Sequence, residues 1–486
     1  MSSSKSSTDS VTQPFGGLAY TYAGLPEALF AQVAPSPVRT PQLLVLNEPL
    51  AQSLGFDADQ LMQDDVVQVL AGNVAPPGGL LLAQAYAGHQ FGNFTILGDG
   101  RALLLGEIVA LDGQRFDIQL KGAGQTPYSR RGDGRAALAP MLREYLVSEA
   151  MHALGVPTTR SLAVVATGQP VYRERPHPGA VLTRVAASHI RVGTFQFAAM
   201  QGEDVLKALA DYTIARHDPD LQDTANPYLG LLNRVIERQA KLIAQWMLLG
   251  FVHGVMNTDN VSIAGETIDY GPCAFMDRYD PATVFSSIDS QGRYAYGNQP
   301  AIGHWNLCRF AEALLPLLDD DEAKALELAQ DAINTYATHY EAAWRSGLAN
   351  KLGVNTRSEE IDRLADDFLA LLQSTEADYT QSFRTLMRQD LPACFNLWLQ
   401  RWNQLINRQP GGKEAARALM AQVNPVAIPR NHLVQAALDT AEQGDLTRFH
   451  ELLKACATPY DSAHEGTIYA EPPPADTGPY VTYCGT

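Results

Sequence analysis

The chain has 486 residues, of which 46% are hydrophobic and 18% are charged, a composition typical of a folded protein of two or three packed units and not of a disordered chain. Its formal net charge of −17 argues against a general nucleic-acid-binding protein, because such proteins need a basic surface. No uninterrupted apolar run of about 18 residues occurs, which argues against a membrane-spanning helix.

The first two hundred residues are predicted to be rich in strands. Residues 1–14 contain no apolar segment of a secretion signal, so we interpret them as a disordered tail of a cytoplasmic protein. Residues 15–79 mix short apolar runs with Pro and Gly and form an N-terminal extension. Within residues 80–203, alternating apolar patterns surround one predicted helix at 136–154 and predict strands at 94–97, 102–109, 115–121, 162–166, 171–173 and 180–185.

Helical patterns dominate from residue 204 onward. A long helix is predicted over 229–249, and two short strands at 261–263 and 267–269 are predicted to pair as a hairpin. Residues 457–486 show little periodicity and are expected to form an extended tail that contains Cys484. Between these segments, apolar periodicity predicts further helices at 323–342, 361–372, 394–406, 414–423 and 433–453.

This order of elements indicates an α+β fold. A sheet-rich half followed by a helical half is the layout of a bilobal protein-kinase-like fold. In that interpretation, residues 80–203 form the N-lobe and residues 204–304 form the C-lobe with the catalytic and metal loops. Residues 305–456 add further C-terminal helices.

A glycine-rich turn at residues 98–101 separates the first two predicted strands. Gly98 and Gly100 permit a tight turn whose backbone N–H groups can approach a phosphate, and Arg101 adds a positive charge. The same turn also fits an ordinary β-hairpin, so it is a weak signal when taken alone.

Lys121 and Glu144 form a second motif. Lys121 ends a predicted strand and Glu144 lies in the helix that follows. Kinases use a helix glutamate to hold a strand lysine against the phosphates of a nucleotide. The alternative is that both residues are solvated surface charges.

Residues 101–200 are locally basic, with 12 Lys and Arg against 7 Asp and Glu, which suggests an anionic ligand such as a nucleotide. Asp133 and Gly134 lie in the loop before the predicted helix, and Arg184 and Arg191 lie at and beyond the last predicted strand. Arginine binds phosphate with two parallel hydrogen bonds. Surface salt bridges are the alternative role for these arginines.

The segment from His253 to Asn260, followed by a D-Y-G triplet that begins at Asp269, is the most specific signal. A kinase catalytic loop reads H-R-D-x-x-x-x-N, and its metal-binding aspartate begins a D-F-G triplet. Asn260 and Asp269 therefore carry the hard oxygen ligands that Mg²⁺ prefers. Val255 stands where a kinase has its catalytic aspartate and cannot accept a proton. The neighbouring Asp259 is the candidate general base, so the chain is either a transferase of another kind or an inactive scaffold.

These motifs together resemble the selenoprotein O family (SelO/YdiU) of pseudokinase-like protein adenylyltransferases. The resemblance extends from about residue 88 to the C-terminus. The stretches that carry it are 88–92, 97–101, 119–124, 128–135, 253–260 and 269–272.

The resemblance implies a kinase-like fold that binds ATP in a flipped orientation and transfers AMP to Ser, Thr or Tyr hydroxyls of proteins, with release of pyrophosphate. It implies that Asp259 is the catalytic base and that Asn260 and Asp269 bind Mg²⁺ or Mn²⁺. The implied nucleotide-binding residues are Gly98, Gly100, Arg101, Lys121, Asp133, Gly134, Glu144, Arg184, Arg191 and Asp269. The expected partners are protein substrates and not nucleic acid or a membrane, and the expected state is a monomer.

Other functions stay open at this point. No residue in the sequence indicates which nucleotide base is recognised, so a uridylyltransferase that uses UTP is one alternative. A non-catalytic ATP-binding scaffold and ordinary phosphotransfer are two others, and the missing kinase aspartate disfavours the last. Cys273 follows the metal-binding triplet and Cys484 lies in the tail, so we hypothesise a redox-sensitive disulfide between them.

Overall fold

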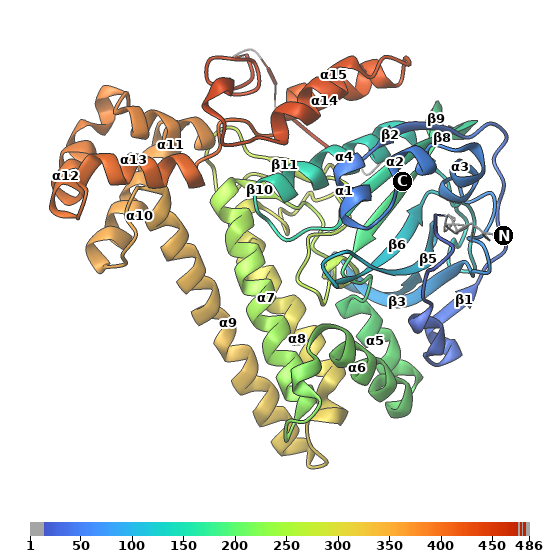
Figure 1. Ribbon diagram of the computed structural model, residues 1–486. Helices are drawn as coiled ribbons and strands as arrows, with labels where there is room; N and C mark the ends of the chain where they lie inside the picture. The colour runs from blue at the N-terminus through green and yellow to red at the C-terminus, as the bar shows by residue number, and fades with distance from the viewer. Residues whose placement is uncertain (1–13, 475–476, 479, 483–486) are drawn as a thin grey trace, which may run out of the picture.

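The computed structural model describes residues 14–474, 477–478 and 480–482. In this part of the chain nine strands form one antiparallel sheet, and helices make up most of the remainder (Figure 1). The strands follow the order β1-β3-β5-β6-β9-β8-β2, with β4 paired to β3 and β7 paired to β9. Their bounds are β1 Phe30–Gln32, β2 Gln42–Leu46, β3 Leu82–Gln90, β4 Asn93–Gly98, β5 Ala102–Val109, β6 Arg115–Lys121, β7 Ala136–Ala137, β8 Arg160–Tyr172 and β9 Pro176–Ala186.

Helices cover both faces of the sheet. On one face α4 (Leu138–Ala153) packs its apolar side chains, such as Leu142, against Val164 and Leu182. On the other face three short helices share a second apolar cluster with β5, β6 and β8. These helices are α1 (Glu48–Ser53), α2 (Ala58–Leu61) and α3 (Asp64–Leu70). The segment before residue 80 therefore contributes β1, β2 and three helices to the sheet-rich lobe.

Five helices build the middle of the helical half and enclose a third apolar cluster. The longest of them is α9, with 30 residues. Helix α7 begins after Asn226, whose side chain accepts a hydrogen bond from Leu229 N, and ends at Gly250, which adopts a left-handed conformation with φ 70°. The five are α5 Val192–Gln201, α6 Glu203–His217, α7 Pro227–Leu249, α8 Gln299–Leu318 and α9 Glu322–Lys351.

The C-terminal helices divide into two groups (Figure 1). Helices α10 (Glu359–Ser374), α11 (Tyr379–Arg388), α12 (Asn396–Arg408) and α13 (Gly412–Val423) gather at the end of α9. Helices α14 (Asn431–Ala441) and α15 (Thr447–Cys456) return to pack on α4. The single helix predicted over 433–453 is wrong, because Gly444 with φ 92° separates α14 from α15.

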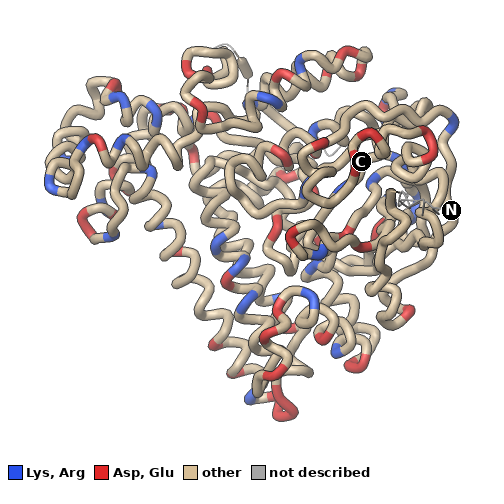
Figure 2. Tube along the Cα trace, viewed as in Figure 1, with Lys and Arg blue, Asp and Glu red and all other residues tan. Residues whose placement is uncertain are grey.

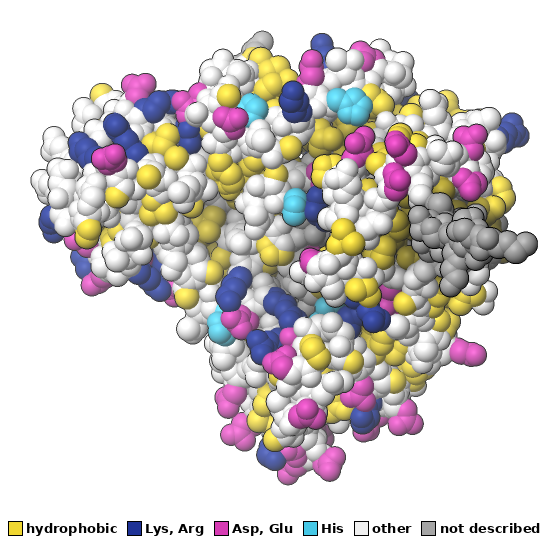
Figure 3. All heavy atoms as spheres, in the orientation of Figure 1, with side chains coloured by type: hydrophobic (Ala, Val, Ile, Leu, Met, Phe, Trp, Pro, Cys, Tyr) yellow, Lys and Arg dark blue, Asp and Glu magenta, His cyan; other side chains and the backbone are white. Residues whose placement is uncertain are grey.

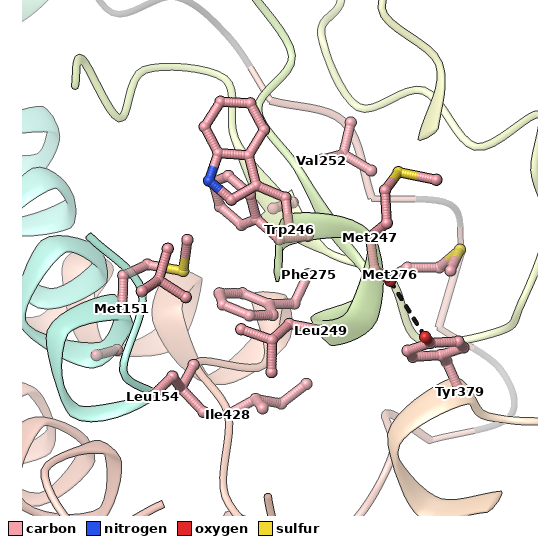
Figure 4. Packing of buried hydrophobic residues seen from close by; sticks show 14 of the residues in the cluster. Met151, Leu154, Trp246, Met247, Leu249, Val252, Phe275, Met276, Tyr379 and Ile428 are labelled. Atoms are coloured by element: carbon pink, nitrogen blue, oxygen red, sulfur yellow. Dashed lines mark hydrogen bonds between the residues drawn. The ribbon is translucent and has the colours of Figure 1, made fainter. Parts of the chain in front are cut away.

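The lobes meet in one apolar core at the end of α7 (Figure 4). Trp246 and Leu249 pack there with Met151 of α4 and with Phe275 of the short strand β11 (Ala274–Phe275). The Tyr379 hydroxyl donates a hydrogen bond of 3.1 Å to Met247 O. This core joins α4, α7 and α11, so it fixes the end of α7 against the sheet-rich lobe.

The predicted hairpin over 261–269 is wrong. The strands that pair here are β10 (Phe251–Val252) and β11, on either side of that segment. Residues 261–269 instead bond to distant backbone: Ile263 N donates to Ile190 O at 3.0 Å, and Thr267 N donates to Pro157 O at 2.9 Å. The segment is thus held mainly by contacts with other parts of the chain, including Gln239 and Trp246 of α7, and not by pairing of two strands within it.

The remaining predictions for elements agree with the structure in type. Strands β5 and β6 have the predicted bounds, while the two strands predicted at 162–166 and 171–173 are one strand, β8. The bilobal α+β layout is confirmed. Within residues 14–474, no helix has the length and apolar character needed to cross a bilayer.

The acidic character of the chain is concentrated away from the sheet. The turn between α8 and α9, at the bottom of Figure 2, carries Asp319, Asp320, Asp321 and Glu322. Charged side chains of both signs cover the neighbouring helical surface in Figure 3. We interpret this end of the molecule as a solvated face.

Candidate functional site

A cleft of about 1060 Å³ opens between the sheet and the loop that follows α7. Its walls include β3, the turn after β4, the end of β6 and the segment from Val255 to Pro272. All twelve residues that the sequence indicates line this one cleft: Gly98, Gly100, Arg101, Lys121, Asp133, Gly134, Glu144, Arg184, Arg191, Asp259, Asn260 and Asp269.

Lys121 and Arg184 occupy the inner wall of the cleft. In the register of β6 and β9, Lys121 pairs with Leu182, so Lys121 and Arg184 point to the same face of the sheet. Lys121 Nζ lies 2.6 Å from Glu144 Oε2 and 2.7 Å from Asp269 Oδ1. Arg184 donates to Glu144 Oε1 at 3.1 Å and to Asp269 Oδ1 at 2.6 Å. The two strands therefore bring two cations to the same pair of carboxylates.

Arg191 adds a third cation from the N-terminus of α5. Its guanidinium donates to Asp269 Oδ2 at 2.7 Å and to the backbone oxygen of Asp259 at 2.6 Å. It also lies over the ring of Tyr86, 4.8 Å from the centroid, which adds a cation–π contact. Three cations, one of them Lys121, thus face two carboxylates, Glu144 and Asp269, and the cluster carries one excess positive charge.

The electrostatics of the cluster keep both carboxylates ionised. Burial alone would raise the pKa of Asp269, but Arg184, Lys121 and Arg191 hold it well below its usual value. Burial likewise opposes the ionisation of Glu144, and Arg184 and Lys121 lower its pKa. A buried group of this kind, with excess positive charge, is suited to binding an anion such as a polyphosphate.

Asp259 is a carboxylate of a different kind. It lies in the short 3₁₀ helix η4 (Thr258–Asn260) and is 7% exposed. Its Oδ1 atom is buried and has no hydrogen-bond partner among the described residues. Burial raises the pKa of Asp259 to about 6, although Arg191 opposes the shift. A buried carboxylate that forms no ion pair among the described residues is suited to accept a proton.

Asn260 and Asp269 can serve as metal ligands. Asn260 Nδ2 donates to Val255 O at 3.0 Å, which leaves the amide oxygen of Asn260 as an acceptor. Among the residues described, no cluster of three or more His, Cys, Asp or Glu side chains could hold a metal ion. Mg²⁺ commonly takes one or two protein oxygens and completes its shell with phosphates and water, so this donor set fits Mg²⁺ or Mn²⁺ bound together with a nucleotide.

His253 braces the loop that carries these ligands. Its Nε2–H donates to Ile268 O at 2.9 Å, and its ring stacks on Trp246 with centroids 5.3 Å apart. Burial lowers the pKa of His253, so the ring stays neutral. His253 therefore connects the start of the loop to the residue before Asp269 and takes no direct part in the cleft.

The turn at residues 98–101 requires glycine at 98 and leaves little room for a side chain at 100. A Cβ at Gly98 would lie 2.4 Å from the ring of Tyr128, and one at Gly100 would lie 3.0 Å from Tyr128 O. The turn therefore packs against the loop that contains Tyr128, and its backbone faces the cleft. Arg101 is half-buried in the same wall.

Asp133 and Gly134 lie at the rim of the cleft. Asp133 is exposed and forms an ion pair of 2.9 Å with Arg173. Gly134 has φ 67°, and a Cβ there would lie 2.1 Å from Gly124 O. Only glycine can therefore bring this part of the loop so close to the neighbouring backbone.

Three further residues of the cleft were not predicted from the sequence. Asp99 is buried, and burial raises its pKa to about 6. Tyr86 carries the Arg191 contact described above. Arg143 Nε donates to Gly271 O at 3.2 Å and so supports the triplet that begins at Asp269. The position of Asp99 between two glycines could have indicated it, whereas nothing local distinguishes Tyr86 or Arg143.

The C-terminal tail reaches the same cleft. Thr482 Oγ1 donates to Pro272 O at 2.8 Å, and Thr482 N donates to Phe285 O at 2.8 Å. Cys273 is fully buried, and burial raises the pKa of its thiol to about 11. Cys484 lies outside the described residues, so the Cys273–Cys484 disulfide stays a prediction.

Comparison with known proteins agrees with this geometry. The family model described as "Protein adenylyltransferase SelO" matches residues 18–457. A "Protein nucleotidyltransferase YdiU" of Shouchella clausii is 57% identical over 475 residues, which cover 96% of this chain and 98% of that protein. The proteins of the same name from Halalkalibacterium halodurans and Geobacillus kaustophilus are 57% and 56% identical, each over 96% of this chain and over 96% and 98% of their own lengths.

Proposed function

The chain belongs to the protein adenylyltransferase SelO family and is a nucleotidyltransferase, and from this premise we propose that it transfers AMP from ATP to Ser, Thr or Tyr hydroxyls of other proteins. The observation that carries the proposal is that the carboxylates of the cleft differ in their partners. Asp269 and Glu144 form ion pairs with cations, while the Asp259 carboxylate is buried and its Oδ1 atom has no partner among the residues that the structure describes. Val255 occupies the position of the kinase base and cannot replace it.

The proposed step is a displacement at the α-phosphorus of ATP. The acceptor hydroxyl loses its proton to Asp259, and its oxygen forms a bond to the α-phosphorus. The bond from that phosphorus to the bridging oxygen of the β-phosphate breaks, and pyrophosphate leaves with the electron pair. A base that is hydrogen-bonded to the acceptor in this way accelerates transfer by about 10²–10⁴.

The cation cluster supports a flipped nucleotide. Lys121, Arg184 and Arg191 are 7%, 1% and 4% exposed, so the positive charge lies at the inner end of the cleft. ATP with its γ-phosphate directed inward places the leaving pyrophosphate on these cations and presents the α-phosphate to the acceptor. The cations then stabilise the charge that develops on the leaving group.

A divalent ion is part of the proposal. Asn260 and Asp269 would hold Mg²⁺ or Mn²⁺, and the ion when bound supplies positive charge to the phosphate oxygens. Glu144 orients Lys121 and Arg184 through the contacts described above. The acceptor is a protein, as the names of the relatives state for those proteins.

Radiolabel position tests the proposal. The protein is incubated with ATP labelled at the α- or the γ-phosphate, or with α-labelled UTP, in Mg²⁺ or Mn²⁺. AMP transfer predicts labelled protein from α-labelled ATP only, with loss of label in Asp259→Asn. Preferential label from UTP would indicate a uridylyltransferase, and label from the γ position would indicate a kinase. Nucleotide binding without any label would indicate a scaffold.

A further inference from the structure

Strand β4 has a free edge. Among the described residues it pairs with β3 alone, through a two-residue turn at Phe91 and Gly92, with φ 50° and 86°. Two positive φ values identify a type I′ hairpin turn, so the pair next to the turn, Gln90 and Asn93, is hydrogen-bonded. Bonded pairs alternate along antiparallel strands. The N–H and C=O groups of Phe94 and Ile96 therefore point away from β3, toward the free edge.

This edge lacks the features that usually protect an edge strand. Natural edge strands carry lysine, proline or a bulge that prevents pairing with another chain. Strand β4 reads Asn-Phe-Thr-Ile-Leu-Gly and carries none of these. The side chains of Phe94 and Ile96 are 45% and 56% exposed. An exposed apolar strand with free backbone groups is suited to accept an added strand.

An aromatic and basic cluster adjoins the edge. The ring of His89 lies 5.0 Å from that of Phe94 and 5.1 Å from that of Trp305. Arg293 and Arg309 lie over the Trp305 ring, at 4.9 and 5.1 Å from its centroid.

The two arginines of this cluster differ in their partners. Arg309 forms an ion pair with Glu312. Arg293 forms no ion pair among the residues described, whereas the buried Nε atoms of both arginines have no hydrogen-bond partner there. Among the described residues, the cluster therefore presents one half-buried arginine, Arg293, whose charge no carboxylate balances.

The hairpin is fixed to the catalytic loop. His89 N donates to Thr258 Oγ1 at 2.7 Å, and Phe91 N donates to Asn257 Oδ1 at 3.0 Å. The backbone of Gly88 contacts Asp259 directly. Because neighbouring strands lie about 4.8 Å apart, a strand added to β4 would lie about 10 Å from β3. If a segment of a partner protein lies in that position, a neighbouring part of the partner is close enough to reach Asp259.

We propose that the free edge of β4 docks the acceptor protein, which adds an extended segment as a strand and pairs an acidic side chain with Arg293. This inference rests on the proposed function, because it assigns the docking site for the acceptor of that reaction. The occupant is an extended segment of alternating apolar residues with a carboxylate near one end. Charge complementarity with Arg293 selects it over a neutral or basic segment.

A peptide library tests the proposal. The probe is a set of peptides with Thr fixed at one position and every other position randomised in turn, labelled with α-labelled ATP. We expect wild type to prefer Asp or Glu at one position by about tenfold, the effect of one charge-assisted hydrogen bond. In Arg293→Glu that preference should change to Lys or Arg at the same position. A purely structural role of Arg293 would lower all rates without changing the preference.

A second pair of variants tests the edge. Ile96→Pro removes an N–H that faces away from β3, which an edge strand tolerates, whereas Ile96→Val retains it. We expect Ile96→Pro to lower peptide labelling at least tenfold with unchanged ATP-induced thermal stabilisation, and Ile96→Val to behave as wild type. Equal peptide rates in all variants and no positional preference would overturn the docking site while leaving the proposed function intact.

Two other outcomes identify different failures. Absence of label on every peptide and every protein, with ATP bound, would overturn the proposed function itself. A dimer of the wild-type protein that Ile96→Pro converts to a monomer would assign the edge to a second copy of this chain. Static light scattering on both proteins separates that outcome from acceptor docking, and the dimer would overturn the proposal.

Discussion

The backbone of Gly88 lies directly against the carboxylate of Asp259. A Cβ added at Gly88 would come within 2.2 Å of Asp259 Oδ1 and 2.8 Å of its Cγ. Gly88 belongs to β3 and Asp259 to the loop after α7, so this contact joins the two lobes at the candidate base. Because residue 88 is glycine, no side chain of β3 occupies the space next to the Asp259 carboxylate.

The first prediction concerns this contact. Gly88→Ala should lower AMP transfer at least tenfold, because the added methyl group must displace the Asp259 carboxylate and a displacement of about 1 Å can cost about 10²-fold in rate. Gly24→Ala is the matched control, since no atom lies within 4 Å of the Cβ it would add. The measurement is the initial rate of labelling at saturating ATP. Equal rates for the two variants would contradict the contact.

The second prediction concerns the base itself. Asp259→Asn keeps the size of the side chain but cannot accept a proton, so transfer should fall by about 10²–10⁴ while ATP binding is retained. Binding is measured by thermal shift with ATP and Mg²⁺. Asp112→Asn, which alters an exposed hairpin carboxylate, serves as the control and should leave the rate unchanged. An active Asp259→Asn protein would move the role of base to another residue.

The third prediction concerns the buried ion cluster. Glu144→Gln removes the carboxylate that Lys121 and Arg184 share, and breaking a buried pair in this way costs about 3–5 kcal/mol of the free energy of unfolding. Glu237→Gln breaks the ion pair between Glu237 and Lys241, whose side chains are 38% and 59% exposed, respectively. This change should lower the free energy of unfolding by about 0.5 kcal/mol or less. Urea unfolding measures both. Similar midpoints would show that Glu144 does not hold the cluster.

Local patterns predicted most of the fold. Strands β5 and β6 follow an alternation of apolar and polar residues that ends at turn residues, and both were predicted with the bounds that the structure shows. Their places on a strand and the next helix left the contact between Lys121 and Glu144 open, with solvated surface charges as the alternative, and the structure decides it by bringing the two side chains to 2.6 Å. The strand bounds depend on neighbours in sequence, which is why a single sequence reveals them.

Long-range contacts account for what the sequence did not reveal. Residues 261–269 fit a hairpin locally, but Ile263 bonds to Ile190 and Thr267 bonds to Pro157, and no local pattern encodes those partners. The convergence of Arg191 on Asp269 depends on the same packing. The break between α14 and α15 has a local cause. Gly444 was a visible signal in the sequence, but the apolar periodicity on either side of it favoured one continuous helix.

The last prediction arises outside the cleft, at Lys351. This lysine ends α9 and is 4% exposed. Its Nζ lies over the Phe383 ring at 4.1 Å and near the Tyr379 ring at 5.4 Å. Among the described residues no carboxylate pairs with it, and burial lowers its pKa to about 7.

Lys351 should make the protein more stable as the pH rises. The pKa of an unfolded lysine is about 10.4, so between pH 7 and pH 10 the unfolded chain binds the extra proton and the free energy of unfolding increases with pH. Below pH 7 both states are protonated and the cost of the buried charge is fully present. Lys351→Met should therefore raise the melting temperature by several degrees at pH 6.5 and by much less at pH 10. Lys413→Met, at an exposed site of α13, is the control and should change the melting temperature little at either pH. A similar response of the two variants would show that Lys351 is not a buried charge.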